Sequence, residues 1–366
     1  MGGPAASQIT VAAWWTIWRA TKADLRPSAL ARLDSTVKTH VLPEWGRLPL
    51  QGVSNAAVRA WIARMVAAGM SASSVRKAHF ALHQMLQAAV ADRKLACDPD
   101  ANVPLPPERH GEQRFLNADE VAALAEAMTE VERATAERTG RDARRRFERF
   151  GPRYQALILV AAYGGLRFGE LAALRRRRVD LLRGRLTVAQ TLVDLNGELS
   201  FGPPKTKNGR RTVPLPRRVV RELAAHTDAH VGAAPDALVF TNTKSGPLRR
   251  AGFRRNWWQP AVRKAGLDPL SFHELRHTFV SLWVAVGANA KEVSVRAGHS
   301  SAAFTLDRYG HLYQDDAIAD RLDDLLRRAK TDLDAEIRPF TIEGSDTEAV
   351  SIVCPEEDDK RRAEAG

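Results

Sequence analysis

A proline-rich stretch at residues 97–114 limits most strongly how this chain can fold. Prolines stand at positions 99, 104, 106 and 107, and the apolar residues between them follow neither a helical nor a strand period. Proline fixes φ and lacks a backbone N–H, so such a stretch is typical of a semi-rigid linker between domains. A chain of 366 residues is also longer than one ordinary core requires. We therefore predict domains over residues 1–96 and 115–330.

The segment before this linker is helical in pattern. Its apolar residues, among them Trp14 and Trp18, recur at close to the helical period, which predicts an all-α domain. Ser54 is a suitable N-cap for a helix over residues 55–68, and another helix is predicted over residues 71–91. Because the tryptophans follow the apolar stripe, we expect them in the core rather than on a surface that stacks DNA bases.

Polar residues crowd the first turns of the helix predicted over residues 71–91. They are Ser73, Ser74, Arg76 and Lys77. Two interpretations carry equal weight: these side chains contact phosphates together with the helix N-terminus, or they form an ordinary solvated face.

The domain after the linker begins with Asn117 as the N-cap of a helix. The highly charged residues 130–149 mix both signs, which favours a solvated helix or loop over a nucleic-acid patch. Residues 154–163 are typical of a buried helix, and this helix is expected to end at Gly164 and Gly165.

Three strand patterns follow, over residues 185–193, 198–205 and 211–215. Asn-Gly pairs, a strong signal for hairpin turns, separate them at positions 196–197 and 208–209. We expect a three-stranded meander, so the fold class is mainly α with a small antiparallel β-meander. The second turn then carries four basic residues at one hairpin tip: Lys205, Lys207, Arg210 and Arg211. Such a tip is usually a solvated turn, but Lys207, Arg210 and Arg211 are also candidates for DNA contacts. Near the C-terminus, residues 317–329 are expected to form a helix and the polar residues 331–366 a mostly disordered tail.

The charge balance predicts a polyanionic partner. Lys and Arg total 55 against 43 Asp and Glu, a formal net charge of +12. Nucleic acid is favoured over a membrane surface, because no amphipathic basic helix or apolar span of membrane length is evident. The two cysteines, Cys97 and Cys354, predict neither a disulfide framework nor a cysteine zinc site. The chain starts without a signal-peptide pattern, so we expect a cytoplasmic protein.

The stretch from Ser271 to Tyr309 holds the densest group of chemically active residues. Ser271 and Glu274 form a capping-box pattern, so a helix is predicted from Phe272 to a stop at Gly287.

Three interpretations of this helix start are open. His273 and Arg276 lie three residues apart on one face, at a helix N-terminus that favours an anion such as phosphate. The same letters match the H-E-x-x-H zinc motif, with His273 and His277 as ligands and Glu274 as base. In the third interpretation the histidines are ordinary capping or packing residues.

Arg167 is a second informative position. It directly follows the glycine pair and a buried helix, which is a poor place for simple solvation. Glu170, three residues later, can orient it. By itself this pattern predicts a structural ion pair.

Four strings combine these residues in one order: GGLRFGEL at 164–171, PKTKNGRRTVPL at 204–215, HELRHTF at 273–279, and GHSS at 298–301 leading to TLDRYGH at 305–311. Together they resemble the tyrosine recombinases, particularly the phage-type integrases, over most of the second domain. The first domain resembles the core-binding domain of that family. The resemblance implies a two-domain clamp around double-stranded DNA, with an all-α core-binding domain and a mixed α+β catalytic domain.

The resemblance also implies the catalytic roles. Arg167 and Arg276 bind the scissile phosphate, and His273 and His299 complete its pocket. Tyr309 is the nucleophile, which forms a 3′-phosphotyrosyl link and releases a 5′-hydroxyl.

The resemblance also implies a catalytic general acid and two residues around the site. Lys205 protonates the leaving oxygen, with Lys207 as the alternative because the strand register is not readable from sequence. Glu170 orients Arg167, and His277 is a packing or supporting residue. No metal or cofactor is expected.

Physical chemistry favours these roles independently. A tyrosine with a pKa near 10 is a weak nucleophile at pH 7, so its developing phenoxide needs adjacent positive charge. Two guanidiniums supply fixed donors for the charge that grows on the phosphate oxygens. The zinc interpretation leaves Arg276 and Tyr309 without a purpose and is therefore disfavoured.

The expected activity is site-specific recombination that integrates or excises a phage or other mobile element. The expected assembly is a nucleoid-associated homotetramer on two duplexes, with an accessory DNA-bending or directionality protein as a further partner. Cis attack by Tyr309 is expected because it lies close in sequence to Gly298. Alternatives are chromosome-dimer resolution, topoisomerase-like relaxation, or a DNA-binding protein that has lost catalysis. Almost nothing precedes Ile9, so we expect either an integrase without an N-terminal arm-binding domain or a truncated chain.

Overall fold

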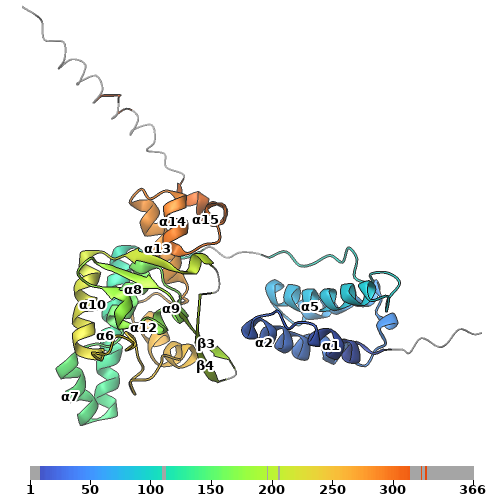
Figure 1. Ribbon diagram of the computed structural model, residues 1–366, viewed down its shortest axis with the longest axis horizontal. Helices are drawn as coiled ribbons and strands as arrows, with labels where there is room; N and C mark the ends of the chain where they lie inside the picture. Colours follow the sequence, from blue (N-terminus) through green and yellow to red (C-terminus); the bar gives the residue numbers. More distant parts are fainter. Residues whose placement is uncertain are drawn as a thin grey trace, which may run out of the picture. The chain divides into compact units, whose positions relative to one another are not determined.

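The computed structural model describes residues 9–108, 113–195, 197–204 and 207–313, together with residues 323, 326 and 327. Helices predominate in these residues, and the strands form two small antiparallel sheets (Figure 1). The helix-rich fold with a small antiparallel β component is confirmed. The predictions for residues 331–366 and for nearly all of residues 317–329 lie outside the described residues. In the described part, no helix is both long and apolar enough to cross a membrane.

The N-terminal part is built from helices, as predicted. In chain order they are α1 Val11–Ala20, α2 Pro27–Thr36, the π-helix η1 Val37–Val41, α3 Leu42–Trp45, the 3₁₀ turn η2 Leu50–Gly52, α4 Asn55–Ala67 and α5 Ala72–Ala91. Ser54 Oγ accepts the Ala57 N–H at 3.3 Å, which confirms the predicted N-cap of α4. Trp14 and Trp18 are buried in a hydrophobic cluster with α5, so the prediction that they are core residues is also confirmed.

The start of the predicted linker is fastened to α5. Asp100 is 3% exposed, and its carboxylate hydrogen-bonds His79 Nε2 at 2.7 Å and His83 Nδ1 at 3.1 Å. Arg76 Nε donates to the Pro106 carbonyl at 2.9 Å. These contacts fix the direction in which the chain leaves α5.

The helices of the second part lie between residues 118 and 313. Apart from one short 3₁₀ turn described below, they are α6 Ala118–Thr139, α7 Arg141–Phe150, α8 Gln155–Gly164, α9 Phe168–Ala172, η3 Arg176–Arg178, α10 Arg217–His230, α11 Arg250–Phe253, η5 Arg254–Trp258, α12 Gln259–Lys264, α13 Glu274–Ala285, α14 Ala290–Ala297, α15 Ala302–Tyr309 and η6 Gly310–Tyr313. Asn117 and Glu120 form a capping box at the start of α6, which confirms the predicted N-cap.

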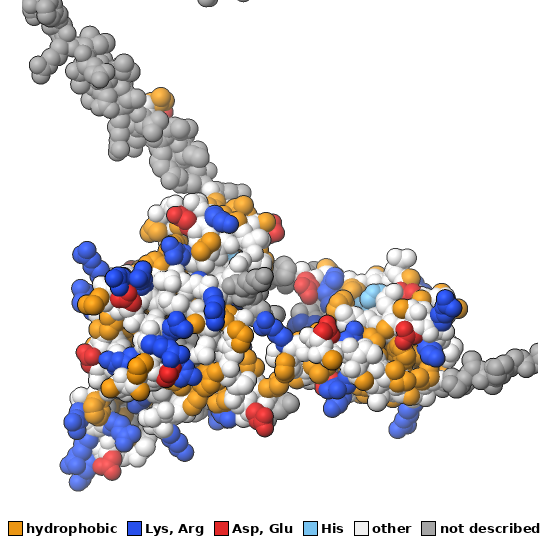
Figure 2. Space-filling view, viewed as in Figure 1, with side chains coloured by type: hydrophobic (Ala, Val, Ile, Leu, Met, Phe, Trp, Pro, Cys, Tyr) orange, Lys and Arg blue, Asp and Glu red, His pale blue; other side chains and the backbone are white. Residues whose placement is uncertain are grey.

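The charged residues 130–149 form the end of α6 and most of α7. None of the ten residues of α7 is buried, and Lys and Arg side chains gather at the end of the molecule that α7 forms (Figure 2). The predicted solvated helix is therefore confirmed for α7. Glu132 departs from the pattern, because its buried carboxylate accepts the backbone N–H groups of Arg153 and Tyr154.

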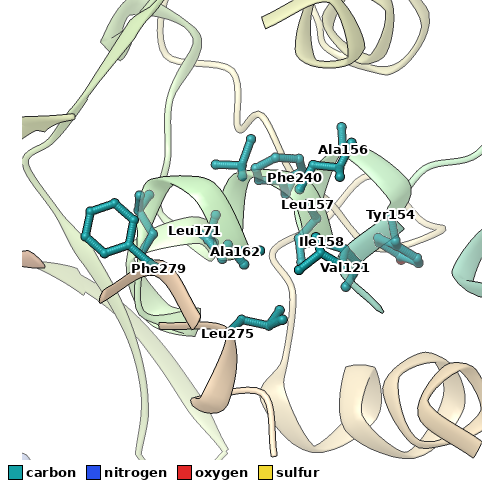
Figure 3. Close-up of a cluster of buried hydrophobic side chains, with 14 of the residues drawn as sticks. Val121, Tyr154, Ala156, Leu157, Ile158, Ala162, Leu171, Phe240, Leu275 and Phe279 are labelled. Carbon is teal, nitrogen blue, oxygen red and sulfur yellow. The ribbon is translucent and has the colours of Figure 1, made fainter. Parts of the chain in front are cut away.

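Helix α8 is the centre of the second hydrophobic cluster. Its residues are buried almost throughout, and α6, α10 and α13 pack against it. Figure 3 shows Leu275 and Phe279 of α13 in the same cluster as Leu157 and Ala162 of α8. The two hydrophobic clusters draw on residues on either side of the predicted linker, but the division into domains at that linker stays a prediction.

The predicted three-stranded meander is wrong. β2 Arg185–Val188 pairs with β5 Arg211–Pro214 and with β1 Val179–Asp180, whereas β3 Thr191–Leu195 and β4 Glu198–Gly202 form a separate hairpin. Burial explains this arrangement. Register places Leu186 opposite Val213, and both side chains are fully buried, whereas the residues of β4 are exposed or half-buried.

The sheet correction also moves the predicted basic tip. The 3₁₀ turn η4 Lys207–Gly209 connects two sheets instead of closing one hairpin. Arg211 is a buried residue of β5 opposite Val188, so it is not at a hairpin tip.

Gly165 ends α8 at a point where no side chain fits. Its φ is +63°, and a Cβ there would lie 2.5 Å from Cδ1 of Phe279, a fully buried ring. Gly287 follows α13 with a φ of +88°, but a Cβ there would meet nothing within 4 Å. The two glycines thus share a left-handed backbone and differ in available space.

We predict that Gly165→Ala destabilises the protein far more than Gly287→Ala. Ala in the left-handed region costs about 1–2 kcal/mol at either site, and overpacking adds roughly 1–3 kcal/mol at Gly165 alone. Urea unfolding of both variants measures the difference. Equal losses would show that Phe279 does not confine Gly165.

Candidate active site

The first site element is the junction between α8 and α9. Gly165 is the left-handed C-cap of α8, and Arg167 is the N-cap residue of α9. The Glu170 carboxylate accepts the Arg167 backbone N–H at 2.9 Å and Arg167 Nη1 at 2.9 Å. Arg167 Nη2 also lies 3.4 Å from the Gly298 carbonyl oxygen. The ion pair expected from the i, i+3 spacing is present, and it holds an exposed guanidinium at the edge of the site.

Arg211 is the buried partner of the same carboxylate. Its Nη2 and Nη1 donate to the two oxygens of Glu170 at 2.8 and 3.1 Å, and its Nε donates to the Arg296 carbonyl at 2.7 Å. Both side chains of the Glu170–Arg211 pair are almost fully buried. Sequence reasoning placed Arg211 among DNA-binding residues; the structure instead commits its guanidinium to a bidentate ion pair.

The electrostatic state of Glu170 follows from these partners. Burial alone would raise its pKa, but the hydrogen bond and charge of Arg211, followed by the charge of Arg167, lower the pKa below its ordinary value. Glu170 is therefore ionised at neutral pH.

Arg276 lies in the first turn of α13 and is 3% exposed. Its Nη1 donates to the Gly165 carbonyl at 2.8 Å, while its buried Nη2 has no hydrogen-bond partner among the described residues. Burial, followed by the charges of Arg167 and Arg211, lowers its pKa to about 9. A charged, buried N–H group without a partner is costly, and an anion would satisfy it.

Helix α13 begins two residues later than predicted. Glu274 is its first residue, and His273 is the N-cap. The Glu274 carboxylate accepts the Ser271 N–H, as the capping-box pattern suggests. His273 is exposed, and its ring packs edge-on against His277 at 5.0 Å between centroids.

His299 enters the site from the connection between α14 and α15. Gly298 is the left-handed C-cap of α14, and His299 Nδ1 hydrogen-bonds Thr305 Oγ1 at 2.9 Å. Asn208 Nδ2 donates to the His299 and Ser300 carbonyls, both at 3.1 Å, and thereby ties η4 to this connection. Burial, then the charge of Arg276, lowers the pKa of His299 to about 3, so the ring is neutral at pH 7.

Tyr309 is the last residue of α15 and is 2% exposed. Its ring stacks on His299 with centroids 5.9 Å apart and an interplanar angle of 6°, and Phe115 packs nearby at 6.5 Å. Burial raises the pKa of its hydroxyl, although the charges of Arg276 and Arg308 and a hydrogen bond with Arg308 oppose the shift. The hydroxyl is therefore protonated in the free protein.

Sequence reasoning treated His277 as a packing or supporting residue and missed its contact with Tyr309. His277 Nδ1 lies 2.6 Å from Tyr309 Oη, across 32 positions of sequence. The signal in the sequence was its place four residues after His273, because residues four positions apart on a helix share a face.

The predicted catalytic residues fall into two groups. Linked contacts bring together Arg167, His273, Arg276, His299 and Tyr309, through Gly165, Glu170, Gly298 and His277. Lys205 lies outside the described residues, and for Lys207 only the backbone is described. The choice between the two lysines therefore stays a prediction.

The predicted DNA-binding residues are divided between two places. Ser73, Ser74, Arg76 and Lys77 are in α5, where Lys77 is exposed and Arg76 is engaged with the Pro106 carbonyl. Arg210 is exposed next to η4. Roles in DNA binding for these residues stay predictions.

Two of the three residues of the zinc interpretation are engaged in other contacts. Glu274 caps the start of α13, and His277 Nδ1 is engaged with Tyr309. Within the residues that the structure describes, no group of three His, Cys, Asp or Glu side chains is arranged to hold a metal ion.

The chain is similar to known proteins both in sequence and in structure. The Phage integrase family matches residues 114–315. The chain is 23% identical over 313 residues to the ICEBs1 integrase of Bacillus subtilis (strain 168), a match that covers 83% of this chain and 79% of that protein.

Solved structures of other integrases share the fold. The Tn1549 transposon integrase in complex with a circular intermediate DNA has a TM-score of 0.68 at 16% identity, covering 87% of this chain and 99% of that one. A lambda integrase tetramer bound to a Holliday junction has a TM-score of 0.57 at 18% identity, covering 82% of this chain and 78% of that one.

We predict that Glu170→Gln lowers the free energy of unfolding by about 3–5 kcal/mol at pH 7, because it leaves the buried Arg211 without a counter-charge. The folded pKa of Glu170 is depressed, so its contribution is present above the unfolded pKa and is lost as pH falls through the folded value. The gap between wild type and variant should therefore narrow below pH about 4.

Urea unfolding at several pH values measures this gap. Glu148→Gln is the matched control, because Glu148 forms an exposed pair with Arg144, and its loss should stay below about 1 kcal/mol. A gap for Glu170→Gln that is independent of pH would contradict the assignment of an ionised, paired carboxylate.

Proposed function

The chain belongs to the phage integrase family, and on that premise we propose how its residues cut and rejoin DNA. It is a tyrosine recombinase, a site-specific recombination enzyme of phages and other mobile elements. The observation that carries the proposed mechanism is the buried Arg276, whose Nη2 has no partner among the described residues and whose charge acts on the Tyr309 hydroxyl.

The arginines bind the scissile phosphate diester. Nη2 of Arg276 has no partner among the described residues and is free to donate to a non-bridging oxygen. Arg167 adds an exposed guanidinium, which its hydrogen bond to the Glu170 carboxylate orients. Fixed donors of this kind stabilise the charge that develops on the phosphate in the transition state without having to reorganise.

Tyr309 attacks phosphorus in this pocket. The phenol oxygen forms a bond to phosphorus, and the 5′-oxygen of the following nucleotide leaves. The product is a 3′-phosphotyrosyl link and a 5′-hydroxyl strand. His273 and His299 complete the pocket, and the neutral ring of His299 stacks on the nucleophile.

Lys205 is the proposed donor of a proton to the leaving oxygen, with Lys207 as the alternative. The support for this role is the family pattern, since neither side chain is described. Lys207 is adjacent in sequence to Asn208, which hydrogen-bonds the carbonyl of His299, and Lys205 lies three residues before Asn208.

Double-stranded DNA is the partner, and we propose that two domains joined at residues 97–114 clamp it. On α5 the exposed Lys77 is the strongest candidate for a phosphate contact, together with Ser73 and Ser74. Arg210 adds a basic group near the catalytic residues.

Assembly is proposed by analogy. The lambda integrase with a similar fold was solved as a tetramer bound to a Holliday junction. We propose a homotetramer that joins two attachment sites, a nucleoid-associated location and an accessory DNA-bending or directionality protein.

We predict a covalent protein–DNA adduct on duplex DNA that carries the element's attachment site, with a nick placed to trap the cleaved strand. The adduct should survive denaturant and form in EDTA, because two arginines supply the charge that a metal would otherwise provide. Tyr309→Phe should abolish it, while the control Tyr163→Phe should not. Adduct formation by Tyr309→Phe would disprove the assigned nucleophile.

We also predict that each subunit cleaves with its own tyrosine. Tyr309 packs on His299 and contacts His277 of the same chain, which favours attack in cis. Mixing Tyr309→Phe with Arg276→Ala subunits on a single half-site should then yield no adduct. Recovery of the adduct in the mixture, at a level set by the ratio of the two variants, would establish attack in trans.

A further inference from the structure

The Tyr309 hydroxyl hydrogen-bonds a histidine that belongs to none of the residues assigned above to the phosphate pocket. That partner is Nδ1 of His277, at 2.6 Å. Both groups are buried, and both are held by packing: the Tyr309 ring lies between His299 and Phe115, and the His277 ring lies against His273.

The other histidines of the cluster are engaged or turned differently. His299 presents its ring face to Tyr309, and its Nδ1 is bonded to Thr305 Oγ1. His273 is exposed, and it contacts the ring of His277 edge-on. In the described cluster, therefore, His277 is the histidine whose ring nitrogen meets the reacting oxygen.

We propose that His277 is the general base for strand cleavage, taking the proton of Tyr309 on Nδ1 as the phenol attacks phosphorus. This inference rests on the proposed function and adds a catalytic residue to it. It replaces the packing role that the sequence alone suggested for His277.

Each bond in the step is accounted for. In cleavage the Tyr309 O–H bond breaks and an N–H bond forms on Nδ1, while the Oη–P bond forms and the P–O5′ bond breaks. The leaving 5′-oxygen takes its proton from the lysine. In rejoining, the incoming 5′-hydroxyl gives its proton to that lysine, and Tyr309 leaves with the proton that His277 returns.

The surroundings of His277 keep its ring neutral in the free protein. Burial, then the charges of His273, Arg308 and Arg276, lower the pKa of His277 to about 4. At pH 7 Nδ1 therefore has a lone pair available in the tautomer that carries its proton on Nε2. His299 and Tyr309 face the same ring, and neither carries a charge at that pH.

Proton transfer is consequently coupled to attack. In the free protein the Tyr309 phenol is a much weaker acid than the protonated ring of His277, because burial raises the pKa of Tyr309 and lowers that of His277. A bound phosphate diester places a negative charge beside Arg276, which offsets the positive field that disfavours a protonated His277. Formation of the Oη–P bond then makes the phenol proton strongly acidic, so it moves during the reaction rather than before it.

The test compares His277→Asn with His277→Ala. Asparagine places an amide near the position of Nδ1 and preserves a hydrogen bond to Tyr309, but it cannot take a proton. The measurements are the single-turnover rate of adduct formation on the nicked attachment-site DNA and the dissociation constant for the same DNA. His230→Asn is the matched control, since the Nε2 atom of His230 has no partner in the described residues and lies on α10.

The proposal expects His277→Asn to lower the cleavage rate at pH 7 by about 100-fold or more, the usual contribution of a general base. DNA binding should change by less than about twofold, because His277 is not assigned to the phosphate pocket. The variant rate should rise about tenfold per pH unit as hydroxide replaces the base, whereas the wild-type rate stays flat between pH 6 and 8. Added imidazole should restore part of the rate of His277→Ala.

A modified substrate separates this role from that of the leaving-group acid. Replacing the bridging 5′-oxygen with sulfur gives a thiolate that leaves without a proton. On this DNA a lysine variant should recover its rate, whereas His277→Asn should stay slow. This arm remains informative even if His277→Ala loses stability.

Two results would overturn the proposal. One is wild-type cleavage by His277→Asn; the other is a slow His277→Ala variant that neither imidazole nor high pH restores, which would leave His277 as a positioning residue. The absence of an adduct with wild-type protein would instead count against the proposed function itself.

Discussion

The carboxylate of Glu170 is the interaction on which the rest of the site depends. It pairs directly with Arg211 and Arg167, and its charge also acts on Arg276. Two like charges about 4 Å apart repel by roughly 4 kcal/mol at an effective dielectric constant of 20. A cluster of buried guanidiniums would therefore oppose folding without this counter-charge. One carboxylate offsets part of the repulsion and leaves the cluster positive, which is the state that a phosphate diester needs.

The second constraint is the carbonyl of Gly165, which accepts from Arg276 Nη1 and lies 3.4 Å from Arg211 Nη2. This carbonyl can serve both arginines because α8 ends there in a left-handed residue against Phe279. The proposed phosphate pocket is thus attached to the centre of the hydrophobic core, where close packing resists displacement. Small errors in the core would be transmitted to the donors that hold the phosphate.

Local signals in the sequence were sufficient for part of this architecture. Ser54 and Asn117 predict helix starts, because the side chain of an N-cap residue accepts a backbone N–H only three residues later. The sheet was misjudged because Asn-Gly turn signals describe only neighbouring strands, whereas β2 selects β5 through the burial of Leu186 and Val213. For the same reason Arg211 was expected at an exposed tip. Glu170, the partner of Arg211, lies 41 positions away in sequence, and a local sequence pattern cannot predict such a pair.

The residues proposed for catalysis could be named from sequence, but the direction in which the ring nitrogens of the histidines point could not. His273, His277 and His299 all carry ring nitrogens of the same kind, and only packing decides which nitrogen meets Tyr309. That packing also bears on the fate of the intermediate. Tyr309 is 2% exposed, so in the proposed mechanism the phosphotyrosyl link forms where water has little access. A neighbouring 5′-hydroxyl, delivered on DNA that the arginines already hold, then has the advantage of position over water. Burial of the nucleophile therefore favours rejoining over hydrolysis, which is the outcome that recombination requires.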